Sequence, residues 1–197
     1  MTRKIVIIGP ESTGKSTLCE QLAQHYNTSW CPEYAREYLL KNGMNYNYDD
    51  LLTIARGQVE LEEKEIQSAA GNPQLAKSHS LLTTHHLPLF IDTNMYVMKV
   101  WCEFVYGKCH QYILDEIAKR KYDLYLLCNT DLPWIKDELR EYPDLETRQR
   151  LYTIYKNIME NQTTPWIEIS GNYEERLQKA ITAVDELLSK DLLPEKN

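Results

Sequence analysis

The sequence predicts a three-layer α/β fold, in which helices cover both faces of a central five-stranded parallel sheet. Short apolar runs alternate with longer amphipathic runs, the pattern of strands joined by crossover helices. The first and fourth apolar runs are almost continuously apolar, as strands buried on both faces must be. The 197 residues have room for one such domain. We expect it to span residues 1–190, with a frayed tail at 191–197.

Each expected strand is a short apolar run, and the five are Lys4–Ile8, Thr28–Cys31, Leu87–Ile91, Tyr122–Cys128 and Trp166–Ile169. Helices are expected to end at Tyr26 and to span about Glu33–Asn42 and about Asp49–Ala70. Apolar residues at helical spacing predict two more sheet-facing stripes, formed by Met98, Trp101, Cys102 and Val105 and by Tyr173, Leu177, Ala180, Ile181, Val184 and Leu188. The segment Gly71–His86 has weak periodicity, so we expect a surface insertion or loop there.

The composition disfavours several classes of protein. The formal charge of -7 argues against a nucleic-acid surface, which needs clustered Lys and Arg. The five cysteines are scattered and odd in number, which is typical of reduced thiols. No run approaches the roughly 18 apolar residues of a membrane span. We therefore expect a cytoplasmic protein that binds neither nucleic acid nor membrane, and an assembly of identical copies is compatible with the sequence.

The segment Gly9–Ser16 reads GPESTGKS and fits the phosphate-binding pattern GxxxxGK[ST] between an expected strand and an expected helix. In such a loop the backbone amides and the helix N-terminus hold the β-phosphate. Lys15 then reaches the β- and γ-phosphates, and the Ser16 hydroxyl offers a ligand to Mg²⁺. The sequence thus predicts a site for ATP and Mg²⁺ made of Gly9, Glu11, Ser12, Thr13, Gly14, Lys15, Ser16 and Thr17.

Asp92 directly follows the expected strand Leu87–Ile91, where a second carboxylate of a nucleotide site should stand. We predict that it binds the metal ion with Ser16 or acts as the general base. The alternative is that Asp92 caps the next helix, a common use of Asp after a strand. The two roles can coexist.

The residues after the second strand favour phosphoryl transfer over a GTPase switch, because neither NKxD nor DxxG follows the phosphate loop. Transfer to a hydroxyl needs a carboxylate for the acceptor and cations for the transferring oxygens. Glu33 and Arg36 offer one of each, although a solvated ion pair between them explains the spacing equally well. The nearby Tyr34 is a further substrate-binding candidate.

Gln58 and Glu62 interrupt an otherwise apolar helical stripe that contains Leu51 and Ala55. Polar groups on a buried face need partners. We therefore include Gln58 and Glu62 among the substrate-binding candidates.

The segment Asp131–Arg140 should form a short helix, capped by Asp131, that aligns Trp134, Asp137 and Arg140 on one face. Arg148 in the next helix falls on the apolar side, where an unpaired guanidinium would be costly. A phosphate partner would resolve this conflict, as would a buried carboxylate. The turn at Gly171, after the last strand, is a weaker candidate for the adenine site.

Together these residues resemble the NadR-like ribosylnicotinamide kinase family of P-loop enzymes, over nearly the whole chain. The shared features are GPESTGKS, EYARE at Glu33–Glu37, Gly57-Gln58 with Glu62, Asp92-Thr93, WCEFVYGKC at Trp101–Cys109, YDLYLL at Tyr122–Leu127, DxPWxxDxxR, Arg148 and the ISG turn. The resemblance implies transfer of the ATP γ-phosphate to the 5′-hydroxyl of nicotinamide riboside, on a sheet of order 2-3-1-4-5. Since the nicotinamide ring is cationic, Trp134 and Tyr38 are candidates for its aromatic contacts.

The chain also departs from the family pattern. Asn94 stands where many relatives have Asp, Glu138 stands where they have Gly, and Gly71–His86 looks longer than usual. The resemblance covers the kinase domain alone. A kinase for another nucleoside or small metabolite, and an ATP-binding regulatory protein with little turnover, are therefore the competing hypotheses.

Overall fold

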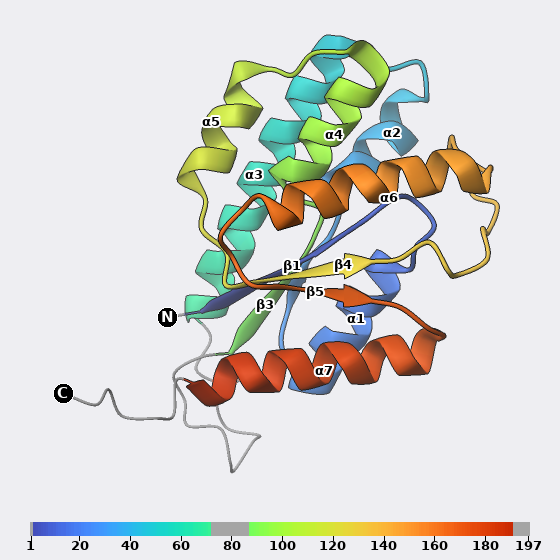
Figure 1. Ribbon diagram of the computed structural model, residues 1–197. Helices are drawn as coiled ribbons and strands as arrows, with labels where there is room; N and C mark the ends of the chain where they lie inside the picture. The colour runs from blue at the N-terminus through green and yellow to red at the C-terminus, as the bar shows by residue number, and fades with distance from the viewer. Residues whose placement is uncertain (1, 72–86, 191–197) are drawn as a thin grey trace.

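A five-stranded parallel sheet forms the centre of the protein (Figure 1), in a computed structural model that describes residues 2–71 and 87–190. Its strands are β1 (Arg3–Ile8), β2 (Trp30–Cys31), β3 (Pro88–Asp92), β4 (Leu124–Cys128) and β5 (Trp166–Ile169). They run parallel in the order β2-β3-β1-β4-β5. The fold class and the strand order expected from the sequence are confirmed.

Helices cover both faces of this sheet. They are α1 (Lys15–Tyr26), α2 (Tyr34–Asn42), α3 (Tyr48–Gly71), α4 (Met95–Tyr106), α5 (Gln111–Lys119), α6 (Leu145–Glu160) and α7 (Tyr173–Lys190). In Figure 1, α1 and α7 lie against one face, whereas α3, α4 and α6 lie on the other side. Within the described ranges, none of these helices is long and apolar enough to span a membrane.

The strand β1 shows why its sequence is continuously apolar. Ile5 and Ile7 pack into the core beneath α1 and α7, and Val6 and Ile8 pack into the core on the opposite face. All four side chains have no exposed surface. Because side chains alternate between faces along a strand, a central strand covered by helices on both sides must be apolar at every position.

The predicted short helix at Asp131–Arg140 is wrong, because this segment has turn and irregular backbone instead. Asp131 does not cap a helix: its carboxylate accepts the Gly171 backbone N–H at 2.6 Å and pairs with Arg176. The true cap lies further along, where the Asp144 side chain accepts the Thr147 N–H at 2.7 Å and begins α6.

Two other expectations need correction. Val105, expected to face the sheet, is 38% exposed, and Tyr173 at the beginning of α7 is 40% exposed. The helix α5 is not among the elements expected from the sequence. The expected loop at Gly71–His86 lies outside the described residues, except that Gly71 is the last residue of α3.

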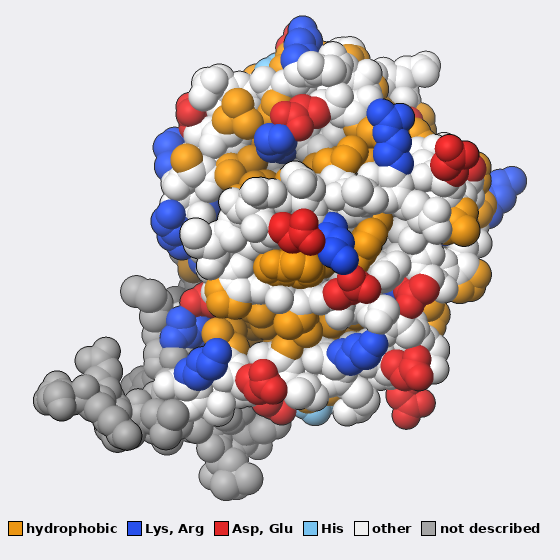
Figure 2. Space-filling view, in the orientation of Figure 1, with side chains coloured by type: hydrophobic (Ala, Val, Ile, Leu, Met, Phe, Trp, Pro, Cys, Tyr) orange, Lys and Arg blue, Asp and Glu red, His pale blue; other side chains and the backbone are white. Residues whose placement is uncertain are grey.

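Acidic and basic side chains are interspersed on the face of the molecule that Figure 2 shows.

Candidate nucleotide and acceptor site

The loop between β1 and α1 has the backbone geometry of a phosphate cradle. Gly9 and Gly14 have φ angles of 141° and 78°, in a region that side chains disfavour. A Cβ atom at Gly9 would lie 2.7 Å from the Cys128 carbonyl oxygen of β4, so this position has no room for a side chain. Gly9 is therefore required by the close packing of the loop against β4, and Gly14 is favoured by its left-handed backbone conformation.

The functional side chains of the motif lie where the sequence analysis expected them. Lys15 Nζ donates a hydrogen bond to the Pro10 carbonyl oxygen at 2.9 Å, which holds the ammonium over the loop. Ser16 Oγ donates to Asp92 Oδ2 at 2.5 Å. This contact follows from the topology, because β1 pairs with β3 in a register that sets Ile7 beside Asp92.

Asp92 is the buried acidic group of the site, and it is only 1% exposed. Burial, reinforced by the nearby Glu33 carboxylate, raises the pKa of Asp92 to about 6, although Lys15 and the Ser16 hydrogen bond oppose this shift. Its Oδ1 atom has no hydrogen-bond partner in the part of the chain that the structure describes. The predicted alternative role as a helix cap is not observed, because the Asn94 side chain accepts the Tyr96 N–H and caps α4.

A magnesium ion fits this pair of residues. The Ser16 hydroxyl and the Asp92 carboxylate are hard oxygen ligands, and an unpartnered buried Oδ1 is what a bound cation would satisfy. Among the described residues no group of three or more His, Cys, Asp or Glu side chains could hold a metal. A site with few protein ligands suits Mg²⁺, which usually keeps several waters and binds phosphate oxygens.

Glu33 lies close to Asp92, directly before α2. Its Oε1 accepts a hydrogen bond from Thr93 Oγ1 at 3.2 Å. Thr93 has a φ of 77°, which a β-branched residue rarely adopts, and such strained backbone clusters at functional sites. Thr93 was missed as a site residue, and its position directly after Asp92 was the available signal.

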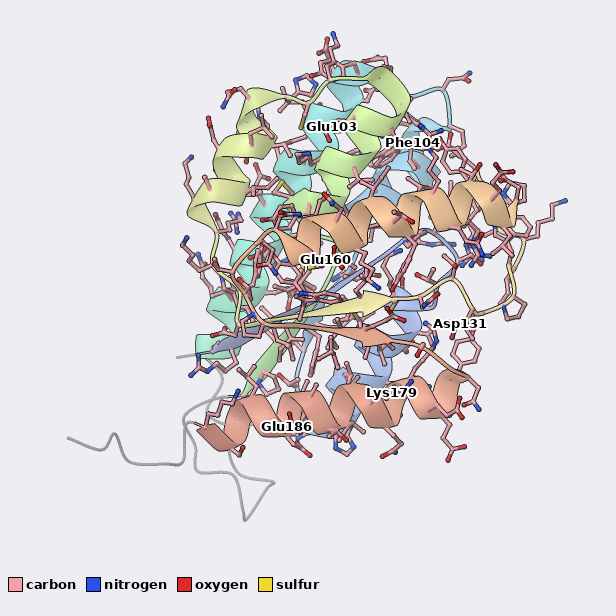
Figure 3. The ribbon with its side chains drawn as sticks, viewed as in Figure 1. Glu103, Phe104, Asp131, Glu160, Lys179 and Glu186 are labelled. Atoms are coloured by element: carbon pink, nitrogen blue, oxygen red, sulfur yellow. The ribbon has the colours of Figure 1, made fainter. Side chains whose placement is uncertain are left out.

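The cradle opens into a cavity of about 300 Å³, which extends toward α4 and α6. The predicted residues that line it are Gly9, Glu11, Ser12, Thr13, Gly14, Lys15, Ser16, Thr17, Glu33, Arg36, Asp92, Asp137 and Arg140. Most of the opposite wall was not predicted, and it includes Val97, Val100, Trp101, Phe104, Tyr142, Leu151 and Tyr155. Phe104 on α4 lies near the beginning of α6 (Figure 3) and its ring packs edge-on against Tyr142.

The irregular segment 131–142, which we call the lid segment, crosses this cavity. On one side the Ser12 hydroxyl of the phosphate loop accepts the Ile135 N–H at 3.0 Å. On the other side Asp137 forms an ion pair with Arg36 of α2 at 3.1 Å. Arg36 therefore pairs with the lid segment, and not with Glu33 as one of the two interpretations of the sequence allowed. Arg140 donates to the Ile135 carbonyl oxygen within the lid segment.

Gln58 and Glu62 do not line the cavity. Gln58 Oε1 accepts the Tyr34 N–H at 2.7 Å and its Nε2 donates to the Pro32 carbonyl oxygen at 3.2 Å, so it braces the turn that carries Glu33. Glu62 pairs instead with Arg120 at 3.1 Å. Both residues therefore contact protein groups: the Glu62 Oε2 atom also accepts a hydrogen bond from the Tyr122 hydroxyl at 2.9 Å, whereas its Oε1 atom has the ion pair but no hydrogen bond among the described residues.

Four further candidates also lie outside the cavity lining. Tyr34 packs against Gly57, and the Tyr38 hydroxyl donates to Asp50 at 2.6 Å. The Trp134 Nε1 atom is buried without a hydrogen-bond partner among the described residues. The Gly171 N–H donates to Asp131 at the beginning of the lid segment, near the end of β4 and the start of α7 (Figure 3).

Two buried arginines, Arg148 and Arg176, donate hydrogen bonds to backbone carbonyl oxygens of the phosphate loop. Arg148 is 2% exposed and its Nη2 donates to the carbonyl oxygens of Ser12 at 3.2 Å and Leu132 at 3.3 Å, so backbone groups stand where the sequence analysis considered a phosphate or, alternatively, a buried carboxylate. Burial lowers the pKa of Arg148. Arg176, which the site prediction omitted, donates to the Thr13 carbonyl oxygen at 2.7 Å and pairs with Asp131.

Comparison with known proteins places this site in a family. The model of a family described as AAA domain matches residues 4–176. Two curated proteins, each called trifunctional NAD biosynthesis/regulator protein NadR, from Escherichia coli (strain K12) and Salmonella typhimurium (strain LT2), are 24% identical over 191 residues. The match covers 94% of this chain but 43% of each relative, so the chain spans less than half of their length.

Solved structures agree on the fold. A NadR protein in complex with NR superposes with a TM-score of 0.69 at 22% identity, covering 95% of this chain and 50% of that one. The same comparison with a NadR protein in complex with NAD and AMP-PNP gives a TM-score of 0.68 at 22% identity, covering 100% and 51% of the chains.

A more distant structure has the same fold: thymidylate kinase from Ehrlichia chaffeensis has a TM-score of 0.61 at 12% identity and covers 93% and 98% of the two chains. The family model spans most of the sequence, and the similarity to NadR extends over nearly all of it. The protein therefore belongs to the AAA domain family of P-loop proteins, as a NadR-like member.

Proposed function

We propose that the protein is an ATP-dependent kinase that phosphorylates the 5′-hydroxyl of nicotinamide riboside. The observation that carries the proposal is one continuous cavity, with a phosphate cradle at one end, the Glu33 and Asp92 carboxylates beside it, and an aromatic wall at the other end. The relatives named for NAD biosynthesis, and the similar fold solved with NR, support nicotinamide riboside as the acceptor.

In this proposal each end of the cavity binds one substrate. The amides around Gly14 and the ammonium of Lys15 hold the triphosphate of ATP. The aromatic wall, including Trp101 and Tyr142, contacts the cationic nicotinamide ring, because a cation is attracted to aromatic faces. Trp134 and Tyr38, expected from the sequence to have this role, are replaced by these cavity residues.

Glu33 is then placed to act as the general base. The acceptor 5′-hydroxyl gives its proton to the Glu33 carboxylate, which Thr93 orients through its hydrogen bond. The oxygen forms a bond to the γ-phosphorus as the bond from that phosphorus to the β,γ-bridging oxygen breaks, and ADP leaves. Asp92 is assigned to the metal side, because its carboxylate already contacts Ser16.

Ser16 and Asp92 would hold the magnesium ion, which neutralises charge on the phosphate oxygens when it is bound. Arg36 and Arg140 line the same cavity and supply further positive charge near the transferring group. Their alignment depends on the lid segment, since Arg36 pairs with Asp137 and Arg140 belongs to the segment itself.

A panel of acceptors tests the proposal. The protein is incubated with ATP, Mg²⁺ and nicotinamide riboside or another nucleoside, and ADP release and phosphorylated product are measured. We expect nicotinamide riboside to give the highest kcat/KM. A higher value with another acceptor would assign the kinase to that substrate. Tight ATP binding with no turnover on any acceptor would instead favour a regulatory role.

A further inference from the structure

Glu11 is an unusual component of a phosphate loop, because a carboxylate repels the phosphates that the loop holds. Its side chain is half-buried and is turned toward the lid segment. Oε1 accepts the backbone N–H of Tyr142 at 2.5 Å, and Oε2 accepts the backbone N–H of Glu141 at 3.0 Å. Both carboxylate oxygens therefore bind the end of the lid segment. Hydrogen bonds of this kind, to an ionised acceptor, are stronger than those between neutral groups.

The contacts continue from the lid segment to the opposite wall of the cavity. The Glu141 carboxylate accepts a hydrogen bond from the Tyr46 hydroxyl at 2.8 Å. The same hydroxyl accepts one from Trp101 Nε1 at 3.0 Å, and the two rings lie edge to face with centroids 5.0 Å apart. Trp101 lines the cavity on the side of the aromatic wall. A continuous chain of polar contacts thus links the phosphate loop to this wall.

We propose that Glu11 is a positioning residue, which fixes the lid segment so that Glu141 and Tyr46 hold Trp101 in place for the acceptor. Its function is directed at the acceptor even though it belongs to the nucleotide loop. This role in acceptor binding rests on the proposed kinase function, whereas the anchoring of the lid segment does not.

The chemistry of the two amides predicts how substitutions act. Glu11→Ala removes both acceptors. Glu11→Gln keeps one acceptor oxygen but turns an NH₂ group toward the second N–H, which leaves that donor unpaired. Tyr46→Phe breaks the chain at its middle, outside the phosphate loop, and removes both the bond to Glu141 and the bond to Trp101.

Amide hydrogen exchange tests the anchoring directly. We expect the Glu141 and Tyr142 amides to exchange about tenfold faster or more in Glu11→Ala, and at least one of them to do so in Glu11→Gln. Glu138→Gln is the matched control, because it neutralises an exposed carboxylate within the same lid segment and should leave exchange unchanged. Unchanged protection in Glu11→Ala would overturn the proposal.

Steady-state kinetics test the role in acceptor binding. In Glu11→Ala and in Tyr46→Phe we expect the KM for nicotinamide riboside to rise by about tenfold while the KM for ATP stays near that of wild type. Since both substitutions break one chain, the double variant should be no worse than Glu11→Ala alone. A raised KM for ATP alone, or fully additive effects, would contradict the proposal.

The two experiments separate this inference from the proposed function. If the wild-type protein phosphorylates no acceptor, the kinase proposal fails. Amide exchange then still decides whether Glu11 anchors the lid segment. If the protein is a kinase and the acceptor KM does not respond, Glu11 has no positioning role.

Discussion

At the scale of single residues, Asp92 is a buried carboxylate that lowers the stability of the fold and serves the proposed reaction. Its carboxylate is buried beside Glu33 and contacts Ser16 of the phosphate loop. Because burial raises the pKa of Asp92 to about 6, the ionised form is less favourable in the folded protein than in the unfolded chain. A bound cation would relieve this cost, so Asp92 is suited to a ligand more than to a structural role.

The substitution Asp92→Asn separates these two roles. We expect kcat to fall by about a hundredfold or more, because the metal side of the site loses its carboxylate. The same variant should be at least as stable as wild type at neutral pH, since a buried charge has been removed. Kinetics and thermal unfolding measure the two effects, with the exposed Asp115→Asn as control. A change confined to KM would exclude Asp92 as a metal ligand or base.

Lys15→Ala should abolish phosphoryl transfer while leaving the fold intact. Within the residues that the structure describes, the ammonium donates a hydrogen bond to the Pro10 carbonyl oxygen alone, so little stability depends on it. The β- and γ-phosphates lose their cation. Activity and circular dichroism are compared with those of Lys41→Ala, which removes an exposed lysine from α2. Transfer at the wild-type rate in Lys15→Ala would refute the assignment of the cradle.

At the scale of elements, the contact between α2 and α3 is set by one glycine. A Cβ atom added at Gly57 of α3 would lie 2.1 Å from the ring of Tyr34. That ring has limited freedom to move away, because the Tyr34 amide is held by Gln58 at 2.7 Å. The same contact keeps Glu33 at the edge of the cavity, one residue before Tyr34.

Gly57→Ala should therefore destabilise the protein, by about 1–3 kcal/mol, as overpacking of a filled core does. In an open helical position the same change would stabilise the protein by about 1 kcal/mol. The sign of the change in stability therefore shows whether Gly57 is in close contact with Tyr34. Chemical denaturation measures the free energy of unfolding, and Glu60→Ala on the exposed side of α3 is the control. A stabilised Gly57→Ala variant would show that the two helices are not in close contact.

The sequence predicted some elements much better than others, for physical reasons. The strand Trp166–Ile169 and the helix that ends at Tyr26 were correct because apolar periodicity and a strong motif mark them. The lid segment was predicted as a helix from Asp131 and Pro133, yet the Asp131 carboxylate is held by Gly171 and Arg176, which lie 40 and 45 residues away. Local capping patterns cannot reveal partners that only the tertiary fold supplies.

At the scale of the whole molecule, hydrogen bonds join the phosphate loop to α7 and to the turn after β5, the edge strand of the sheet. Arg176 of α7 donates to the Thr13 carbonyl oxygen and pairs with Asp131, while the Asp131 carboxylate also accepts the Gly171 N–H. Burial opposes ionisation of Asp131, but the Gly171 amide and Arg176 prevail and lower its pKa.

This lowered pKa predicts an acid-sensitive fold. The stabilisation by ionised Asp131 is present above the ordinary carboxyl range, near pH 4, and is lost as the pH falls through the lower pKa of the folded state. Asp131→Asn should lower the free energy of unfolding at pH 7. Its free energy of unfolding should then fall less on acidification than that of wild type. Thermal unfolding between neutral and acidic pH measures this, with the exposed Glu186→Gln of α7 as control. An acid profile identical to that of wild type would exclude this linkage.

The candidate site was predicted only in part, because local sequence patterns do not show which residues the tertiary fold brings together. Residues of one contiguous motif, such as Lys15 and Ser16, were found because their spacing carries the chemistry. The apolar wall was missed because Val97 and Phe104 look like ordinary core residues in the sequence. Their role emerges only when α4 and α6 are packed across the cavity from the phosphate loop.

The proposed function requires one cavity that holds ATP beside a nucleoside hydroxyl. This is tested by incubation with Mg²⁺, nicotinamide riboside and ATP labelled with ¹⁸O at the non-bridging oxygens of the γ-phosphate, followed by mass spectrometry of the products. We expect nicotinamide mononucleotide that carries the labelled phosphoryl group, and unlabelled ADP. Labelled inorganic phosphate with unchanged nicotinamide riboside would contradict it.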